Sequence, residues 1–212
     1  MQDKASLRAQ IIAHRDAVPP EQRTAWSHNI CQTAITLPQY ASAKVIHCIL
    51  SMRSEVETHM LIEHALAHGK RVAIPHFVRN RDETPCLEIH TLDPTAYSIS
   101  GFGLRIPRTK TIIAPDAIDL VFVPLVAFVA KSALRRIEDT PKPSIIDTTY
   151  LRVGYGAGYY DRFLTRLRLG VARIGLAFEL QRVLDFTVEP HDVPLDLVVS
   201  ENLRKALVVG LL

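Results

Sequence analysis

The hydrophobic and polar residues of this chain repeat with two periods, one typical of helices and one typical of buried strands. Near the N-terminus, Leu7, Ile11 and Ile12 recur at helical spacing within residues 4–17, and the helical pattern starts again after the proline pair at 19–20. These two segments predict a pair of antiparallel helices at the start of the chain.

Short apolar runs further along the chain predict buried strands. Residues 44–51 and 71–77 form two such runs, and the segment between them, residues 55–70, is amphipathic with a helical period and reaches Gly69 near its end. A strand, a helix and a strand in this order form a β-α-β unit. We therefore expect a sheet that is at least partly parallel.

The order of the elements indicates an α/β fold of three layers, in which an open, mainly parallel sheet is flanked by helices. Further strands are predicted at residues 86–92, 119–128, 171–179, 196–201 and 206–210. At 212 residues with 48% hydrophobic content, the chain is long enough for one large domain, which we expect to span residues 1–212. Residues 129–151 interrupt the alternation, because they are polar and carry two prolines, and they predict an inserted surface loop.

Charge and cysteine content narrow the range of partners and compartments. The formal net charge is +3, but Lys and Arg are dispersed along the chain, so we expect no nucleic-acid partner. No apolar run reaches the roughly 18 residues of a membrane span, and the first residues, MQDKASLRAQ, lack the apolar core of a signal peptide. We expect a cytoplasmic protein without membrane contact, a monomer or weak dimer, whose three separated cysteines are reduced.

The stretch RVGYGAGYYDRFL, residues 152–164, carries three glycines in five positions. Its spacing differs from the dinucleotide fingerprint G-x-G-x-x-G, and it lacks the Lys-Ser/Thr pair that completes a P-loop. A glycine turn that leads into a helix presents free N–H groups to a phosphate, but a plain turn at a close packing contact needs the same glycines. From the glycines alone, the two interpretations are equally good.

This stretch and four others resemble the 5-formyltetrahydrofolate cyclo-ligases, also called 5,10-methenyltetrahydrofolate synthetases, whose motif is approximately R-L-G-x-G-x-G-Y-Y-D-R. The other four are KASLR near the start, ILSMRSEVET, VPLVAF, and GLAFELQ followed by EPHDVPLDLVVSE. They occur in the order found in the family over nearly the whole chain, apart from residues 129–151. The resemblance implies a fold like that of the sugar-phosphate isomerases and CoA transferases.

The same resemblance implies an enzyme that converts 5-formyltetrahydrofolate to 5,10-methenyltetrahydrofolate with ATP and Mg²⁺, releasing ADP and phosphate. In such enzymes the formyl oxygen is expected to attack the γ-phosphate, and N10 of the folate then closes on the phosphorylated imine and expels phosphate. Phosphorylation turns a poor leaving group into a good one, so the main tasks of the protein are positioning and charge neutralisation.

The resemblance also implies roles for individual residues. Arg152 and Tyr159 are the expected catalytic residues, and Asp161 and Asp192 are the expected Mg²⁺ ligands. ATP is expected to bind at Lys4, Arg8, Arg152, Val153, Gly154, Tyr155, Gly156, Ala157, Gly158, Tyr159 and Tyr160. The folate is expected to bind at Leu50, Glu55, Tyr155, Gly156, Ala157, Gly158 and Tyr159.

Local sequence patterns support some of these roles and suggest structural alternatives to others. Lys4 and Arg8 are four residues apart on one predicted helix face, as two cations that bind one polyanion would be, although a solvated helix face has the same pattern. Glu55 follows a predicted strand, and a capping role competes with a substrate contact there. Ser54 and Glu57 have the spacing of a capping box, which would leave Glu55 free for the substrate.

Several residues keep other interpretations open. Packing is as good a role for Tyr160 as a ligand contact, and Ala157 would be strained if its position required a positive φ. Leu125 replaces a glycine that is usual in the family, and Val129 stands where the family often has aspartate. A non-enzymatic domain of the same fold that senses a folate, a nucleotide or a sugar phosphate is an alternative, as is an inactive homologue, because a fold alone does not determine a function.

Overall fold

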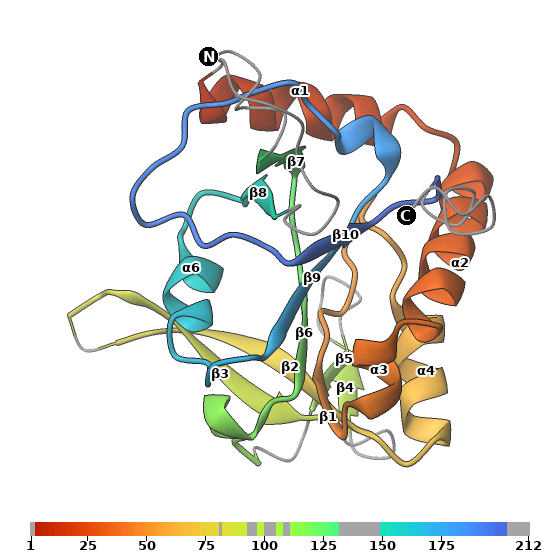
Figure 1. Ribbon diagram of the computed structural model, residues 1–212, viewed down its shortest axis with the longest axis vertical. Coiled ribbons are helices and arrows are strands. Elements are labelled where there is room, and N and C mark those ends of the chain that lie inside the picture. Colours follow the sequence, from red (N-terminus) through yellow and green to blue (C-terminus); the bar gives the residue numbers. More distant parts are fainter. Residues whose placement is uncertain are drawn as a thin grey trace, which may run out of the picture.

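A six-stranded sheet forms the centre of the computed structural model, which describes residues 3–80, 82–92, 97–99, 105–107, 111–131 and 149–202 (Figure 1). The strands lie in the order β10-β9-β6-β1-β2-β3, and all neighbouring pairs are parallel except β2 with β3. Their bounds are Val45–His47 (β1), Arg71–Arg79 (β2), Pro85–Thr91 (β3), Leu120–Val123 (β6), Ala172–Leu176 (β9) and Leu197–Val199 (β10). The α/β class and the mainly parallel sheet are confirmed.

Helices cover both faces of the sheet, and two small antiparallel pairs accompany it. The helices are α1 (Lys4–Asp16), α2 (Pro20–Ile35), α3 (Pro38–Ser42), α4 (His59–Ala67) and α6 (Tyr159–Leu164), with 3-10 turns η1 (Pro115–Ala117) and η3 (Glu179–Gln181). The small pairs are β4 (Tyr97–Ile99) with β5 (Arg105–Pro107), and β7 (Ala127–Ala130) with β8 (Tyr150–Val153). Within the described residues, none of the helices combines the length and apolar character that crossing a bilayer requires.

The central strand β6 is apolar throughout because the sheet is buried on both faces. All four residues of β6 are buried, as is usual for a strand with parallel neighbours and helices on either side. Phe122 packs with Ile46 on the face covered by α2 and α4. Val121 and Val123 pack on the opposite face with Phe163 of α6. The β-α-β unit predicted from residues 44–77 is present as β1, α4 and β2.

The first two helices do not form the antiparallel pair predicted from the sequence. Asp3 caps α1 by accepting a hydrogen bond from the Ser6 amide at 2.9 Å, and α1 then lies across one end of the molecule while α2 runs down its side (Figure 1). The apolar face of α1, with Leu7 and Ile11, packs on the β7–β8 pair and Phe186. The prediction was wrong because this small sheet, and not α2, covers that apolar face.

The predicted strand 119–128 is also wrong, since the chain forms two strands there. Pro124 follows β6 and lacks the N–H that a continuing ladder needs. The chain then starts β7 at Ala127, which pairs with Val153 of β8. As a result both ends of the predicted loop, residues 129–130 and 150–151, are strand residues, and the glycine turn follows β8 directly. The strand predicted at 206–210 lies outside the described residues.

Leu125, which stands in place of the usual family glycine, fills a space that another glycine leaves open. A methyl group added at Gly175 in β9 would lie 2.6 Å from Leu125 Cδ2 and 2.9 Å from Leu195 Cδ1. Both leucines are buried, so neither can turn out to solvent. The large side chain at residue 125 therefore fits only because residue 175 has no side chain.

We predict that Gly175→Ala lowers the free energy of unfolding by about 1–3 kcal/mol, because it overpacks the core. Leu125→Ala should cost about 2–5 kcal/mol by leaving a cavity. In the double variant the new methyl group occupies part of that cavity, so the two costs should be less than additive by about 0.5–3 kcal/mol. Urea denaturation of the four proteins measures this coupling, and strictly additive costs would contradict the contact.

Candidate active site

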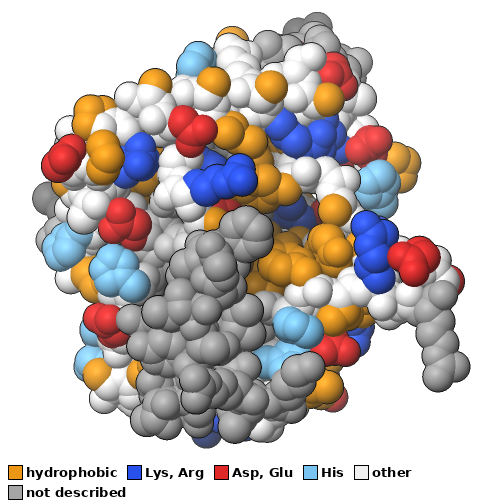
Figure 2. Space-filling view, turned by 180° about the vertical axis from the view of Figure 1, so that it is seen from behind, with side chains coloured by type: hydrophobic (Ala, Val, Ile, Leu, Met, Phe, Trp, Pro, Cys, Tyr) orange, Lys and Arg blue, Asp and Glu red, His pale blue; other side chains and the backbone are white. Residues whose placement is uncertain are grey.

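A cleft of about 510 Å³ opens beside the carboxyl ends of β1 and β6, where ligands commonly bind in open α/β sheets. On the face seen in Figure 2, hydrophobic side chains form the floor of a hollow and Lys and Arg side chains stand around it. Its basic lining is Lys4, Arg8, Arg15, Arg53 and Arg152. Its apolar lining includes Ile12, Leu50, Met52, Pro75 and Phe77. One cleft thus offers positive charge and apolar surface together.

Two cations enter the cleft from α1, as their spacing predicts. Lys4 Nζ donates to Asp192 at 2.7 and 2.9 Å and to Glu189 at 2.6 Å. Burial by itself lowers the pKa of Lys4, but the hydrogen bonds to the two carboxylates outweigh it and raise the pKa. Arg8 Nε donates to the Gly154 carbonyl at 2.7 Å. The first helix is therefore fastened to the glycine turn and to the loop that carries Asp192.

The three glycines of the turn make room for arginine side chains. A Cβ at Gly154 would lie 2.8 Å from an Arg152 nitrogen, and one at Gly158 would lie 2.9 Å from an Arg162 nitrogen. At Gly156 a Cβ would lie 3.4 Å from Arg8, and the φ of +103° there is one that side chains rarely adopt. The glycines thus allow guanidinium groups to pack against bare backbone.

The turn also has backbone donors without partners in the described part of the chain. Among the described residues, no hydrogen bond uses the amide N–H groups of residues 155–158. Successive unpaired N–H groups in such a turn form an anion-binding concavity. Ala157 does not have a positive φ, so its methyl group causes no backbone strain. Both interpretations of the glycines therefore have support, close packing from the arginines and anion binding from the free N–H groups.

Arg152 lies almost fully buried beneath the turn, where it pairs with Asp161. One of its terminal nitrogens donates to Asp161 Oδ1 at 2.7 Å, and the Val193 amide donates to the same oxygen at 3.4 Å. Burial lowers the pKa of Arg152, and the neighbouring Asp161 opposes that shift. Arg152 Nε is buried and has no hydrogen-bond partner in the described part of the chain. Arg152 lines the cleft with other atoms, whereas this donor is shielded from it and stays unsatisfied.

Glu55 is engaged, in contrast to the expectation that it is free. Its carboxylate accepts hydrogen bonds from the Met52 amide at 2.8 Å and from the Tyr155 hydroxyl at 2.5 Å. The capping box was wrong as well, because α4 begins only at His59 and Ser54 instead donates to Asp16. The side chain of Ser54 therefore belongs to a buried side-chain network and does not cap a helix.

That network includes Arg15, a residue that the sequence analysis missed. Arg15 is buried, and it donates to Ser54 Oγ at 3.0 Å and to the Tyr155 hydroxyl at 3.1 Å. Burial and the nearby carboxylate of Glu55 raise the pKa of Tyr155. Tyr155 is therefore held as a neutral hydroxyl between a cation and an anion at the rim of the cleft. Only the helical spacing of Arg8 and Arg15 on α1 could have suggested Arg15.

The two adjacent tyrosines have different surroundings. Tyr159 lines the cleft and packs edge-on against Phe77 with ring centroids 5.1 Å apart. Tyr160 is buried, and its hydroxyl lies 2.9 Å from Nε2 of the fully buried His47. Packing is thus a clear role of Tyr160. The side chain of Val153 is buried in the core beneath α1, so any ligand contact of Val153 would have to come from its backbone.

The other predicted site residues all line the same cleft. They are Lys4, Arg8, Leu50, Glu55, Arg152, Asp161 and Asp192, with residues 154–160 of the turn. Fold and cleft together define an α/β protein whose cleft combines basic side chains with an apolar wall. Residues 1–135 and 143–201 match the sequence model of the 5-formyltetrahydrofolate cyclo-ligase family, and the chain belongs to this family.

Individual relatives agree with this assignment. The chain is 28% identical over 209 residues to 5-formyltetrahydrofolate cyclo-ligase of Mus musculus, with 94% of both chains covered. It is 26% identical to the enzyme of the same name from Haemophilus influenzae, covering 94% of this chain and 98% of the relative. A solved 5,10-methenyltetrahydrofolate synthetase from Mycoplasma pneumoniae has a TM-score of 0.70 at 25% identity, over 94% of this chain and 99% of that one.

The family resemblance drawn from the five sequence motifs is therefore confirmed. The chain is a cyclo-ligase of folate one-carbon metabolism, and its family is one of ATP-dependent ligases. The family model leaves residues 136–142 unmatched, a shorter gap than the loop predicted at 129–151.

The buried His47 predicts how stability depends on pH. Burial lowers the pKa of His47 to about 3, from 6.5 when exposed. The unfolded chain therefore binds a proton below pH 6.5 that the folded chain excludes, so stability is highest above pH 6.5 and falls as the pH drops. The expected slope approaches about 1.4 kcal/mol per pH unit. In urea denaturation between pH 6.5 and 5, His47→Gln should remove that slope, and an unchanged slope would contradict the assignment.

Proposed function

We propose that the cleft binds ATP and 5-formyltetrahydrofolate side by side and forms 5,10-methenyltetrahydrofolate, ADP and phosphate. The observation that carries the proposal is the pairing of the glycine turn with an apolar wall across one cleft. A triphosphate suits the turn and its cations, whereas a flat pterin ring suits the wall. A sensor of a single ligand would not need both.

The triphosphate end of ATP binds at the turn. Residues 155–158 offer unpaired N–H groups, and Lys4, Arg8 and Arg152 supply positive charge from either side. The buried Nε of Arg152 is an unsatisfied donor, and a small shift of the side chain would let a phosphate oxygen satisfy it. Contacts of Val153 use its backbone, and those of Tyr160 are limited to the ring that lines the cleft.

The pterin binds against the apolar side of the cleft. Leu50, Phe77 and Tyr159 form a surface on which a flat ring can pack. Glu55 is the acceptor for the N–H donors of the pterin, and it reaches them by exchanging its hydrogen bond with Tyr155. Tyr155, released from Glu55, remains held by Arg15 and covers the ligand.

The reaction needs an oxygen nucleophile and a phosphorus atom to be aligned. The formyl oxygen attacks the γ-phosphate, the bond to the leaving ADP breaks, and N10 of the folate then closes on the activated carbon and expels phosphate. In this proposal Arg152 and Tyr159 contact the reacting groups, and the presence of both in the lining of the cleft supports that role. Their contribution is charge neutralisation and alignment.

A hard divalent cation fits the acidic side of the cleft by the chemistry of its donors. Asp161 receives both of its described hydrogen bonds on Oδ1, so Oδ2 remains available, and Asp192 and Glu189 add carboxylate oxygens nearby. Such oxygen donors are those Mg²⁺ prefers when phosphates complete its coordination. When bound, Mg²⁺ neutralises charge on the phosphates.

The proposal also includes a cytoplasmic location and a monomer or weak dimer as the oligomeric state. The three cysteines, Cys31, Cys48 and Cys86, are free thiols, which agrees with a reducing cytoplasm. Burial raises the pKa of Cys31 to about 12, which keeps that thiol protonated and unreactive. A monomer or weak dimer suffices, because every residue that this mechanism uses comes from one chain.

The glycine turn can be tested by adding a side chain at its centre. Gly156→Val should abolish measurable ATP binding in calorimetry, because the side chain would meet Arg8 and oppose the positive φ. The strain should cost about 1–3 kcal/mol of stability, which a thermal melt measures. Gly69→Val is the matched control, because Gly69 also has a positive φ but lies outside the cleft with open space around it. Equal ATP affinity in the parent and in folded Gly156→Val would mean that the phosphate binds elsewhere.

The reaction and the role of Asp161 can be tested together. The purified chain should convert 5-formyltetrahydrofolate, seen as an absorbance gain, only with ATP and Mg²⁺. Asp161→Asn should lower turnover far more than folate affinity and raise the Mg²⁺ concentration for half-maximal rate by about tenfold or more. Asp192→Asn, which also loses the partner of Lys4, is the comparison. An active Asp161→Asn enzyme with unchanged Mg²⁺ dependence would leave Asp161 only as the ion-pair partner of Arg152.

A further inference from the structure

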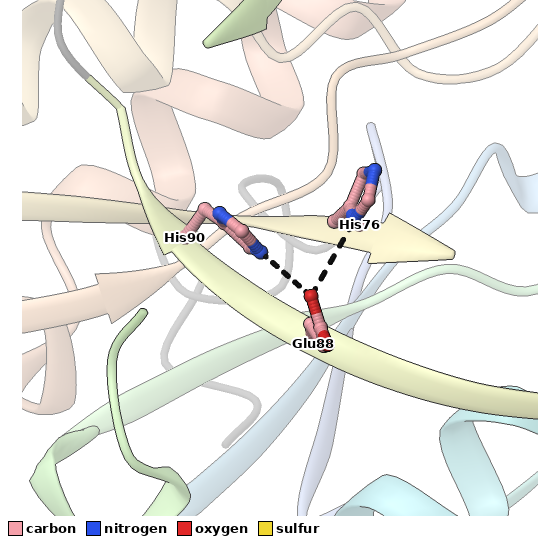
Figure 3. A group of neighbouring side chains, drawn as sticks. All are labelled: His76, Glu88 and His90. Atoms are coloured by element: carbon pink, nitrogen blue, oxygen red, sulfur yellow. Dashed lines mark hydrogen bonds and ion pairs between the residues drawn. The ribbon is translucent and has the colours of Figure 1, made fainter. Parts of the chain in front are cut away.

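A cluster of two histidines and a glutamate lies on the β2–β3 hairpin, outside the cleft. In the antiparallel register His76 stands opposite Glu88, and Ile74 stands opposite His90. Because side chains two residues apart on a strand share a face, His76, Glu88 and His90 all project from the same face of the hairpin. Figure 3 shows both imidazole rings directed toward the carboxylate of Glu88.

Two of the three distances in the cluster are close to the edge length of a metal coordination tetrahedron, and the third is bounded. His90 Nε2 lies 3.1 Å from Glu88 Oε2, and His76 Nδ1 lies 3.5 Å from the same oxygen. The three ligand atoms all lie within 4.8 Å of one another. In a tetrahedral Zn²⁺ site with bonds of about 2.0–2.2 Å, neighbouring ligand atoms are about 3.3–3.6 Å apart. Small side-chain shifts would therefore place all three atoms around one ion.

A second observation indicates that the cluster lacks a partner. His76 Nδ1 is buried, yet it has no hydrogen-bond partner among the described residues; it lies at an ion-pair distance of 3.5 Å from Glu88 Oε2. A buried, unsatisfied ring nitrogen is uncommon in native proteins, where an ion or an ordered water often satisfies such an atom. The side chains of His76 and Glu88 are 41% and 40% exposed, so a cation can enter from solvent.

We propose that His76, Glu88 and His90 form a binding site for a transition-metal cation of the Zn²⁺ type. Two imidazole nitrogens and one carboxylate oxygen are ligands that suit Zn²⁺, whereas Mg²⁺ prefers oxygen alone, so this site differs in selectivity from the acidic side of the cleft. Three protein ligands leave one tetrahedral position for water.

Occupancy of this site links two strands that also form the wall of the cleft. The neighbour of His76 in β2 is Phe77, and the neighbour of Glu88 in β3 is Leu87; these two pair across the hairpin and face the other side of it. Phe77 lines the cleft and packs against Tyr159. A cation on one face of the hairpin therefore holds together the strands that position Phe77 on the other face.

The test uses the full chain after treatment with a chelator, with Zn²⁺ alone as the probe in calorimetry. We expect Zn²⁺ to bind, and His76→Ala and Glu88→Gln each to weaken that binding by at least tenfold, since loss of a ligand costs at least as much as loss of a ligand's partner. His68→Ala is the matched control, because Nδ1 of His68 already contacts the His64 carbonyl in the parent and is no ligand of the proposed site. The Zn²⁺ affinity of the His68→Ala variant should equal that of the parent.

Zn²⁺ should also raise the melting temperature of the parent and of His68→Ala, but not of the two ligand variants. Melts without metal identify a variant that has lost Zn²⁺ binding only because it is unfolded. If Glu88→Gln is unfolded, the result for His76→Ala decides the test, because His76 is half-exposed and its replacement should leave the fold intact. The second described group with ligand spacing is Glu189, His191 and Asp192 in the cleft. Absence of Zn²⁺ binding, unchanged binding in both ligand variants, or loss of binding only in His191→Ala would each overturn the proposal.

Discussion

The burial of one guanidinium group is the constraint on which the site depends. Arg152 is 5% exposed, and it can lie beneath the turn only because residue 154 has no side chain and because Asp161 neutralises its charge. An unpaired buried charge would cost several kcal/mol, so β8, the turn and α6 must keep a single arrangement in which arginine and aspartate meet. In the same arrangement the amides of residues 155–158, which line the cleft, have no hydrogen-bond partner among the described residues. The missing side chains of the glycines thus have two consequences: guanidinium groups can pack against the turn, and its N–H groups remain open to an anion.

Charge pairing also assembles the cleft from distant parts of the chain. Lys4 is joined to Asp192, 188 residues away, and Arg8 to the Gly154 carbonyl, 146 residues away. Each cation therefore already has a partner before a ligand arrives. A polyanion that binds here exchanges one set of charge contacts for another, so its net gain in free energy is smaller than the sum of its new contacts. The buried Nε of Arg152 is an exception, because any partner there is a gain.

The β2–β3 hairpin contributes side chains to the cleft from one face and to the His76, Glu88 and His90 cluster from the other. Side chains alternate along a strand, so Phe77 faces the cleft while its neighbour His76 faces the cluster with Glu88 and His90. Where β2 passes the carboxyl end of β1, β3 is its only strand partner among the described residues, and its stability then depends on the pairing within the hairpin. A contact between the two strands on one face thereby affects the wall on the other.

The amino-acid sequence alone determined the β-α-β unit, the mainly parallel sheet, the glycine turn and the membership of the cyclo-ligase family, because each of these depends on residues close together in the chain. Helical and strand periods are local, and so is the spacing of the motifs. Only the tertiary structure decided that α1 packs on β7 and β8, that the apolar run around Pro124 splits between two sheets, and that Arg15, Ser54, Glu55 and Tyr155 form one network. These outcomes depend on which surfaces and charges meet across long stretches of sequence, 140 residues in the case of Arg15 and Tyr155, and such pairings have no period that a sequence can display.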